Sequence, residues 1–280
     1  MTASPTFRST LLSQRAADIQ PFHVMELLRR ARELEAQGRD IIHMEVGEPD
    51  FGTPAPVVEA ATRFLAGGDV HYTPALGLPA LREAIARFYH DRFGADVAPE
   101  RIVVTAGASG ALMLALAATT DPGDEWLLPD PGYPSNRHLI RAFEGVARAL
   151  AVDAASRYQP RPEQVDAAWG ERTRGLMVAT PSNPTGTLLS VAEIAALHRR
   201  TRARDGVLLV DEIYQGLTYG VESATALADP VLNAADDVFV VNSFSKYFGM
   251  TGWRLGWVVA PQAYVRQIEK LAQHFFISPS

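Results

Sequence analysis

Residues 207–214 decide the fold, and their sequence is Val207-Leu208-Leu209-Val210-Asp211-Glu212-Ile213-Tyr214. Four consecutive apolar residues precede two acidic ones, and an uninterrupted apolar run of this kind is typical of a strand buried on both faces of a sheet. The same pattern recurs along the second part of the chain. Five further apolar runs, each followed by a polar or Gly/Pro turn, cover residues 102–105, 125–128, 175–179, 238–241 and 255–259.

Helical stretches, in which apolar residues recur three and four positions apart, precede and separate these runs. The clearest cover residues 22–37, 57–65, 78–93, 109–118 and 192–204. Strands that alternate with helices predict an α/β fold with a mostly parallel sheet and helices on both faces. Ligands of such sheets bind beyond the carboxyl ends of the strands, so the polar residues directly after each run are the candidates for a functional site.

The composition excludes several classes of protein. The chain has 280 residues, of which 47% are hydrophobic and 21% charged, with a net charge of −6 and no cysteine. A mildly acidic chain has no bulk electrostatic reason to bind nucleic acid or an anionic membrane surface. Without cysteine there are no disulfides, thiolate nucleophiles or thiolate metal ligands, and we expect a cytoplasmic protein without a metal site. The N-terminus has no apolar core typical of a secretory signal.

Chemically distinctive residues follow five of the predicted strands. In chain order they are the turn Ala106–Gly110, Tyr133, Asn183, Asp211 and Lys246. Each alone has an ordinary structural explanation, such as a turn, an N-cap at Ser109, side-chain packing or a salt bridge. Together they offer a phosphate site, an aromatic plate, an amide, a carboxylate and an amine at one edge of a sheet, which suits a phosphorylated pyridine aldehyde.

Lysine usage singles out one amine. Of the 26 basic residues, 24 are arginine, and the only lysines are Lys246 and Lys270. Lys246 lies in Ser243-Phe244-Ser245-Lys246, beside aromatic and hydroxyl side chains that would partly desolvate it and make it a better nucleophile. Arg254, eight positions later, has the bidentate geometry that binds a phosphate. Lys270 belongs to a stretch typical of a solvated helix face.

These motifs resemble a known family. The sequence is similar, over roughly residues 15–280, to fold-type I aminotransferases of class I/II that depend on pyridoxal 5′-phosphate (PLP), and most of all to the aspartate aminotransferase-like branch. The matching stretches are Val46–Phe51, Tyr72–Gly77 with Leu81-Arg82, Gly107–Leu112, Asn183–Gly186, Asp211–Tyr214 and Ser243–Lys246 with Gly252 and Arg254. The fold implied is the large domain of a PLP-dependent transferase.

The resemblance implies three catalytic residues. Lys246 would form the internal aldimine with PLP and then move the proton between Cα and C4′ in a ping-pong reaction. Asp211 would keep the pyridine nitrogen protonated. Tyr214 would donate to the ring oxygen together with Asn183.

The resemblance also implies the remaining binding residues and a homodimer. Tyr133 would stack on the ring, and Tyr72 would reach the phosphate of the neighbouring subunit. The phosphate would otherwise be held by Gly107, Ala108, Ser109, Ser243, Ser245 and Arg254. Gly47 and Asn183 would contact the substrate, an amino acid or a 2-oxo acid.

The sequence departs from the family pattern at its C-terminus. Family members continue into a segment that completes a small domain and carries an arginine for the substrate carboxylate. We therefore expect an N-terminal arm and partial small domain at residues 1–47, whose C-terminal half is missing, and a large PLP-binding domain at residues 48–280.

Other functions remain open at this point. PLP-dependent β-lyases, decarboxylases and synthases bind the cofactor with the same set of residues. A truncated chain could also bind PLP without turnover. A nicotinamide dehydrogenase, the general alternative for a sheet of this type, is disfavoured because the sequence has no G-x-G-x-x-G motif.

Overall fold

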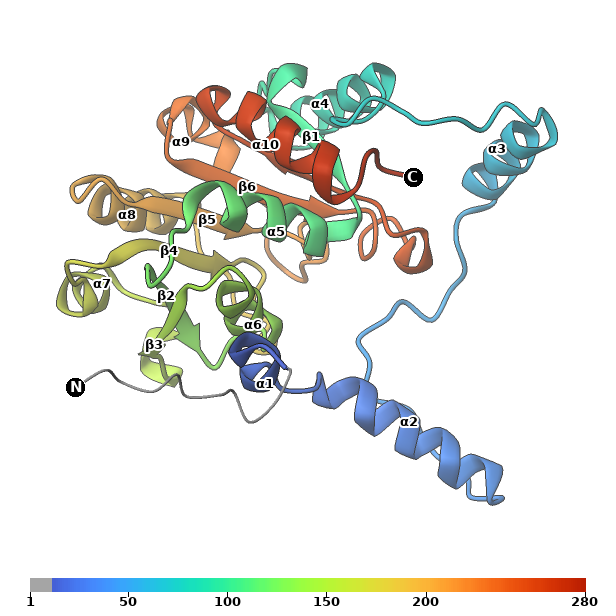
Figure 1. Ribbon diagram of the computed structural model, residues 1–280, viewed down its shortest axis with the longest axis horizontal. Helices are drawn as coiled ribbons and strands as arrows, with labels where there is room; N and C mark the ends of the chain where they lie inside the picture. The colour runs from blue at the N-terminus through green and yellow to red at the C-terminus, as the bar shows by residue number, and fades with distance from the viewer. Residues whose placement is uncertain (1–11) are drawn as a thin grey trace, which may run out of the picture.

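One seven-stranded sheet organises the chain in the computed structural model, which describes residues 12–280 (Figure 1). The first eleven residues of the predicted N-terminal arm lie outside the described part. The strands are β1 (Ile102–Thr105), β2 (Glu125–Asp130), β3 (Val146–Ala151), β4 (Thr173–Ala179), β5 (Val207–Asp211), β6 (Val238–Ser243) and β7 (Gly256–Val259). Their order across the sheet is β1-β7-β6-β5-β4-β2-β3. Six of the seven coincide with the predicted apolar runs.

The sheet is mostly parallel, as predicted. Strands β6, β5, β4, β2 and β3 run parallel to one another, and only β7 is antiparallel to its neighbours β1 and β6. The register pairs Ala179 with Asp211 and Asp211 with Val241. The carboxyl ends of β4, β5 and β6 therefore meet at one edge of the sheet, and the side chains that follow them are brought together there.

Helices cover both faces of this sheet, which confirms the two-sided architecture (Figure 1). One face packs against α5 (Gly107–Thr119), α6 (Ser135–Ala142) and α10 (Gln262–Phe275). The other packs against α4 (Pro79–Phe93), α7 (Pro162–Ala168), α8 (Val191–Arg202), α9 (Pro230–Ala234) and the 3-10 turn η3 (Ala226–Ala228). Three further 3-10 turns are η1 (Pro99–Arg101), η2 (Ala154–Ser156) and η4 (Thr251–Trp253). Because each central strand is covered twice, its residues are apolar without alternation.

Strand β3 was not predicted, and its composition explains why. Its sequence, VARALA, is rich in strong helix formers and has one β-branched residue. It lies at the edge of the sheet and pairs in parallel with β2 alone, so most of its residues stay exposed or half-exposed. Pairing with the neighbouring strand β2 outweighs the local helix propensity, and no local sequence pattern reveals this pairing.

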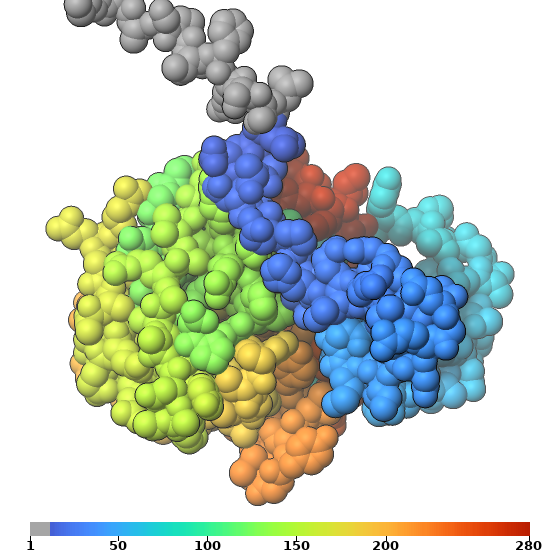
Figure 2. Space-filling model, turned by 90° about the horizontal axis from the view of Figure 1, so that it is seen from below, coloured from blue at the N-terminus to red at the C-terminus, as the bar shows by residue number. Residues whose placement is uncertain are grey.

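The three N-terminal helices contribute no buried residue to this core. Helices α1 (Gln14–Asp18), α2 (His23–Ala36) and α3 (Ala55–Ala66) contain no buried residue. Figure 2 shows these blue and cyan segments beside the body of the molecule rather than within it. α1 is tied to α6 by an ion pair of 2.9 Å between Asp18 and Arg141. No helix within residues 12–280 is both long and apolar enough to cross a membrane.

Candidate active site

A buried carboxyl group lies at the centre of the sheet edge. Asp211 is the last residue of β5 and is 5% exposed. Its Oδ1 accepts a hydrogen bond of 3.0 Å from the backbone N–H of Ile213. Burial raises the pKa of Asp211 to about 6, and the bond from Ile213 opposes this shift only in part. A carboxylate in this position favours a cationic N–H donor as partner.

A phenol and an amide lie beside this carboxyl group. The Nδ2 of Asn183 donates to the hydroxyl oxygen of Tyr214 at 3.1 Å, so the loops after β4 and β5 meet. Burial raises the pKa of Tyr214, while the bond from Asn183 acts in the opposite direction. The charge of Asp211 also raises the pKa of Tyr214, so the phenol and the buried carboxyl group belong to one neighbourhood.

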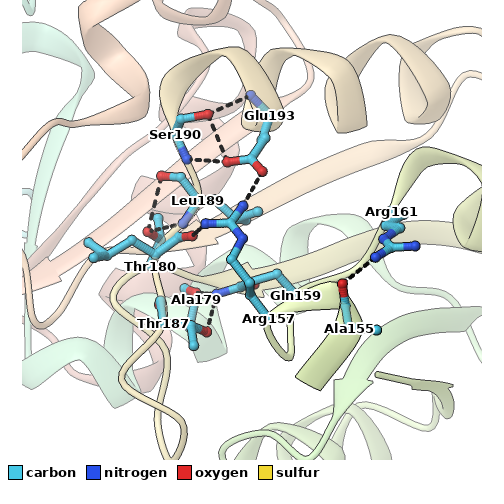
Figure 3. Close-up of polar contacts among 11 residues, drawn as sticks. Ala155, Arg157, Gln159, Arg161, Ala179, Thr180, Thr187, Leu189, Ser190 and Glu193 are labelled. Atoms are coloured by element: carbon cyan, nitrogen blue, oxygen red, sulfur yellow. Dashed lines mark hydrogen bonds and ion pairs between the residues drawn. The ribbon is translucent and has the colours of Figure 1, made fainter. Parts of the chain in front are cut away.

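The loop that carries Asn183 is held at both ends, as the close-up shows (Figure 3). The hydroxyl oxygen of Thr180 accepts from the backbone N–H of Leu189 at 3.0 Å. Gln159, 2% exposed, donates from Nε2 to the carbonyl oxygens of Ala179 at 3.1 Å and Thr187 at 3.2 Å. The sequence analysis missed Gln159 because no motif marks a residue that binds a loop twenty or more positions away in the sequence.

The amine of Lys246 lies at the same edge, three residues after the end of β6. Its Nζ is 5.8 Å from the centroid of the Tyr214 ring and donates to the carbonyl oxygen of Gly47. Burial lowers the pKa of Lys246, and Arg254 adds to this effect while Glu48 opposes it. At neutral pH a larger fraction of this amine is therefore in its nucleophilic form than for a solvated lysine.

The start of helix α5 forms an anion cradle. Gly107 opens the helix with a φ of +69° and Ala106 occupies the N-cap without a side-chain bond. The backbone N–H groups of a first helical turn have no partner within the helix and carry its positive dipole end. The ordinary explanation of Ser109 as the N-cap is wrong, because Ser109 lies inside the first turn of the helix. Its side chain is exposed there, whereas Ala108 beside it is buried.

Arg254 closes the cradle from the β6–β7 side. A Cβ placed on Gly107 would lie 2.5 Å from a terminal guanidinium nitrogen of Arg254, so this side chain lies directly over the helix start. Two hydroxyl groups lie on the same loop, and Ser243 Oγ donates to Ser245 Oγ at 2.9 Å. Amide, guanidinium and hydroxyl donors in one place fit a phosphate group.

The remaining predicted residues lie at the periphery. Tyr133, half-buried after β2, has its ring edge-on to Phe22 at 5.9 Å between centroids. Tyr72 is 81% exposed in the segment between α3 and α4. Phe22 was not predicted, since an aromatic residue just before a helix is usually plain packing. Among residues 12–280 there is no group of three His, Cys, Asp or Glu side chains able to hold a metal ion.

The donor set fits pyridoxal phosphate on its geometry. A phosphate fits the cradle of Gly107 and Arg254, a ring N–H fits the buried carboxyl group of Asp211, and an aldehyde fits the amine of Lys246. The ring oxygen of the cofactor fits the phenol and amide of Tyr214 and Asn183.

Comparison with known proteins identifies the family of the chain. Residues 39–280 match the family model described as aminotransferase class I and II. A valine–pyruvate aminotransferase of Mycobacterium tuberculosis is 38% identical over 263 residues, which are 94% of this chain and 67% of that relative. A crystal structure of an aminotransferase from the same organism matches with a TM-score of 0.90 at 37% identity, over 97% of this chain and 69% of that one. An aspartate aminotransferase from Thermus thermophilus with maleate gives 0.90 at 35% identity, over 96% and 69%.

Proposed function

The chain belongs to the class I and II aminotransferases, which move an amino group between an amino acid and a 2-oxo acid, and we propose that it does so with PLP held at Lys246. The observation that carries the proposal is the position of Lys246. A half-buried amine with a lowered pKa lies at the same sheet edge as the buried Asp211, 5.8 Å from the Tyr214 ring.

The chain's own residues divide the chemistry between them. When bound, PLP supplies an aldehyde that joins amines and a ring that takes up the electron pair released when a bond to Cα breaks. Asp211 would accept a hydrogen bond from the protonated ring nitrogen, a charge-assisted bond worth roughly 1.5–3 kcal/mol. Lys246 Nζ would take a proton from the substrate Cα and deliver it to C4′ of the cofactor. Tyr214 and Asn183 would donate to the ring oxygen and orient the ring.

The phosphate would be held by the first turn of α5 and its surroundings. The backbone N–H groups of Gly107, Ala108 and Ser109 would supply neutral donors. The hydroxyl of Ser245 would supply one more, oriented by the bond that it accepts from Ser243. Arg254 supplies the charge and a bidentate fork. Tyr133 would stack on the ring.

The substrate, the partner subunit and the domains complete the proposal. Gly47 and Asn183 would contact the substrate, because the carbonyl oxygen of Gly47 is already next to the Lys246 amine. Relatives are named for aspartate and for valine with pyruvate, so these are the first substrates to test. We propose a cytoplasmic homodimer with shared sites, in which the side chain of Tyr72, 81% exposed here, would reach the phosphate of the neighbouring subunit. The proposed domains are residues 1–47, an arm and partial small domain, and residues 48–280.

A reductive labelling experiment tests the proposal. The chain is loaded with PLP, freed of excess, reduced with borohydride and mapped by mass spectrometry, with parallel samples that receive aspartate, or valine and pyruvate, before reduction. We expect an adduct at Lys246 that decreases with the amino acid, none in Lys246→Ala, and an unchanged adduct in the control Lys270→Ala. Labelling of Lys246→Ala, or labelling only at Lys270, would overturn the assignment.

A further inference from the structure

A second carboxyl group is buried directly beside Asp211 and has no role in the mechanism above. Glu212 is 0% exposed, and its backbone N–H still pairs with Val241 of β6. Since successive strand residues point to opposite faces, the Glu212 side chain enters the layer between the sheet and η3. There its oxygens accept hydrogen bonds of 2.7 Å from the Thr225 hydroxyl and 2.7 Å from the backbone N–H of Ala226.

These two bonds close the loop of residues 213–224, which carries Tyr214. The loop leaves the end of β5 and returns at Thr225, so Glu212 joins its two ends. Inside it, Ser223 Oγ donates to Gln215 Oε1 at 2.5 Å and accepts from the backbone N–H of Gly216 at 2.9 Å. The loop is therefore built on polar bonds that depend on the position of its ends.

The closed loop also contacts the segment that carries the reactive amine. Gly216 has a φ of +92°, and a Cβ placed there would lie 2.5 Å from the ring of Tyr247. Tyr247 is the residue directly after Lys246. A displacement of the loop would therefore change the position of the Tyr214 phenol and the support of the Lys246 segment together.

From this arrangement we infer that Glu212 is a positioning residue for the aminotransferase site. By joining the end of β5 to Thr225 and Ala226, Glu212 fixes the loop that places the Tyr214 hydroxyl against Asn183. The inference rests on the proposed function, because it assigns to Glu212 an effect on the bound cofactor.

Two substitutions of Glu212 distinguish a positioning role from a requirement for its negative charge, because the Thr225 hydroxyl and the Ala226 N–H respond differently to them. In Glu212→Gln the amide oxygen can accept from the Ala226 N–H while the amide nitrogen donates to the Thr225 hydroxyl oxygen, so the loop ends remain joined. In Glu212→Leu, which has a similar volume, a hydroxyl and an N–H would be left buried and unpaired, so the loop ends would separate. Thr225→Val removes one of the two bonds and leaves the carboxyl group in place.

The experiment compares these variants in the full chain by PLP affinity, melting temperature without cofactor, and the pH dependence of the absorbance of bound PLP. The control is Thr201→Val, which removes an equally buried hydroxyl from α8 (Thr201 and Thr225 are both 0% exposed). We expect Glu212→Leu to weaken PLP binding about tenfold, which corresponds to about 1.4 kcal/mol. Glu212→Gln should stay within about twofold of the parent chain, and Thr225→Val should lie between the two.

A spectroscopic comparison adds a readout that loss of stability alone does not change. Glu212→Leu should shift the midpoint of the absorbance titration in the same direction as Tyr214→Phe, and the double variant should shift it little further, because both changes act through the same phenol. Thr201→Val should lower the melting temperature and leave affinity and midpoint unchanged.

The outcomes keep the two proposals apart. If the parent chain forms no adduct at Lys246, the proposed function fails. If it forms the adduct, and Glu212→Leu binds PLP with the parent's affinity and midpoint, the role of Glu212 fails. Equal losses in Glu212→Gln and Glu212→Leu would show that charge is what matters, and this too would overturn the positioning role.

Discussion

Replacing Gly107 by alanine should separate cofactor binding from stability. Gly107 opens α5 with a φ of +69°, and a Cβ there would lie 2.5 Å from one terminal nitrogen of Arg254 and 3.1 Å from its Cζ. Arg254 is exposed, and its guanidinium is the end of a flexible side chain, so it can move away without disturbing the core. The variant should therefore fold, with Arg254 displaced from the cradle.

Two terms set the size of the effect. An alanine in left-handed conformation loses roughly 1–2 kcal/mol of stability, which lowers the melting temperature of a chain of this size by about 2–8 °C. Binding loses more, because a displaced Arg254 no longer makes charge-assisted bonds to the phosphate. Such a bond contributes roughly 1.5–3 kcal/mol, so PLP affinity should fall about 10- to 150-fold.

Gly94→Ala supplies a matched control. Gly94 ends α4 with a φ of +63°, and a Cβ there meets nothing within 4 Å. This variant carries the same backbone strain without the steric effect on Arg254. It should show a similar loss of melting temperature and an unchanged dissociation constant for PLP, both measured by titration of the cofactor's absorbance and by thermal denaturation.

Two results would refute the reasoning about the cradle. Parent-like PLP affinity in Gly107→Ala would mean that Arg254 and the start of α5 do not hold the phosphate. An equal loss of affinity in Gly94→Ala would mean that general loosening, rather than the displaced guanidinium, weakens binding.

Three further predictions concern titrating groups. Burial raises the pKa of Asp211 to about 6 and that of Glu212 to about 7, above the values of an unfolded chain. The folded chain therefore binds more protons than the unfolded chain between about pH 4 and 7. Its stability without cofactor should fall as the pH rises through this range. Thermal melts should show this slope, and Asp211→Asn should reduce it. Burial lowers the pKa of Lys246, so trace acetylation of this residue should reach half-maximum at lower pH in the native chain than in urea; equal midpoints would contradict the desolvated amine. The bond from Asn183 lowers the pKa of Tyr214, so Asn183→Ala should move the ultraviolet titration of that phenol, identified by its loss in Tyr214→Phe, to higher pH.

The sequence predicted the parts of the fold that are buried on both sides. Runs such as residues 207–210 are apolar without interruption because helices cover both faces of the sheet, and this leaves a local signal. The edge strand β3 is less buried than the central strands on both faces, so its composition reflects solvent exposure and does not predict a strand. Its pairing with β2 is a tertiary fact that a local pattern does not contain.

The candidate site residues were predicted for a different reason. Asp211, Asn183 and Lys246 each follow a predicted strand, and in a parallel sheet the ends of neighbouring strands meet at one edge. The residues that brace them were missed. Gln159 and Thr225 act through bonds to loops that are distant in sequence, and polar residues of these types occur in any turn.

The carboxyl group of Asp211 shows why the site is distinct from the core that supports it. Leu208 and Leu209 lie on the same strand and are fully buried, and truncating either should remove roughly 2–5 kcal/mol of stability. Asp211 is almost as buried, yet above pH 6 its ionised form lowers stability, because burial penalises the charge. Without cofactor, Asp211→Asn should therefore melt higher than the parent chain at pH 8, although it should bind PLP more weakly. Such a cost in the empty site is what the proposed function expects, because a cationic ring N–H bound beside Asp211 would offset it.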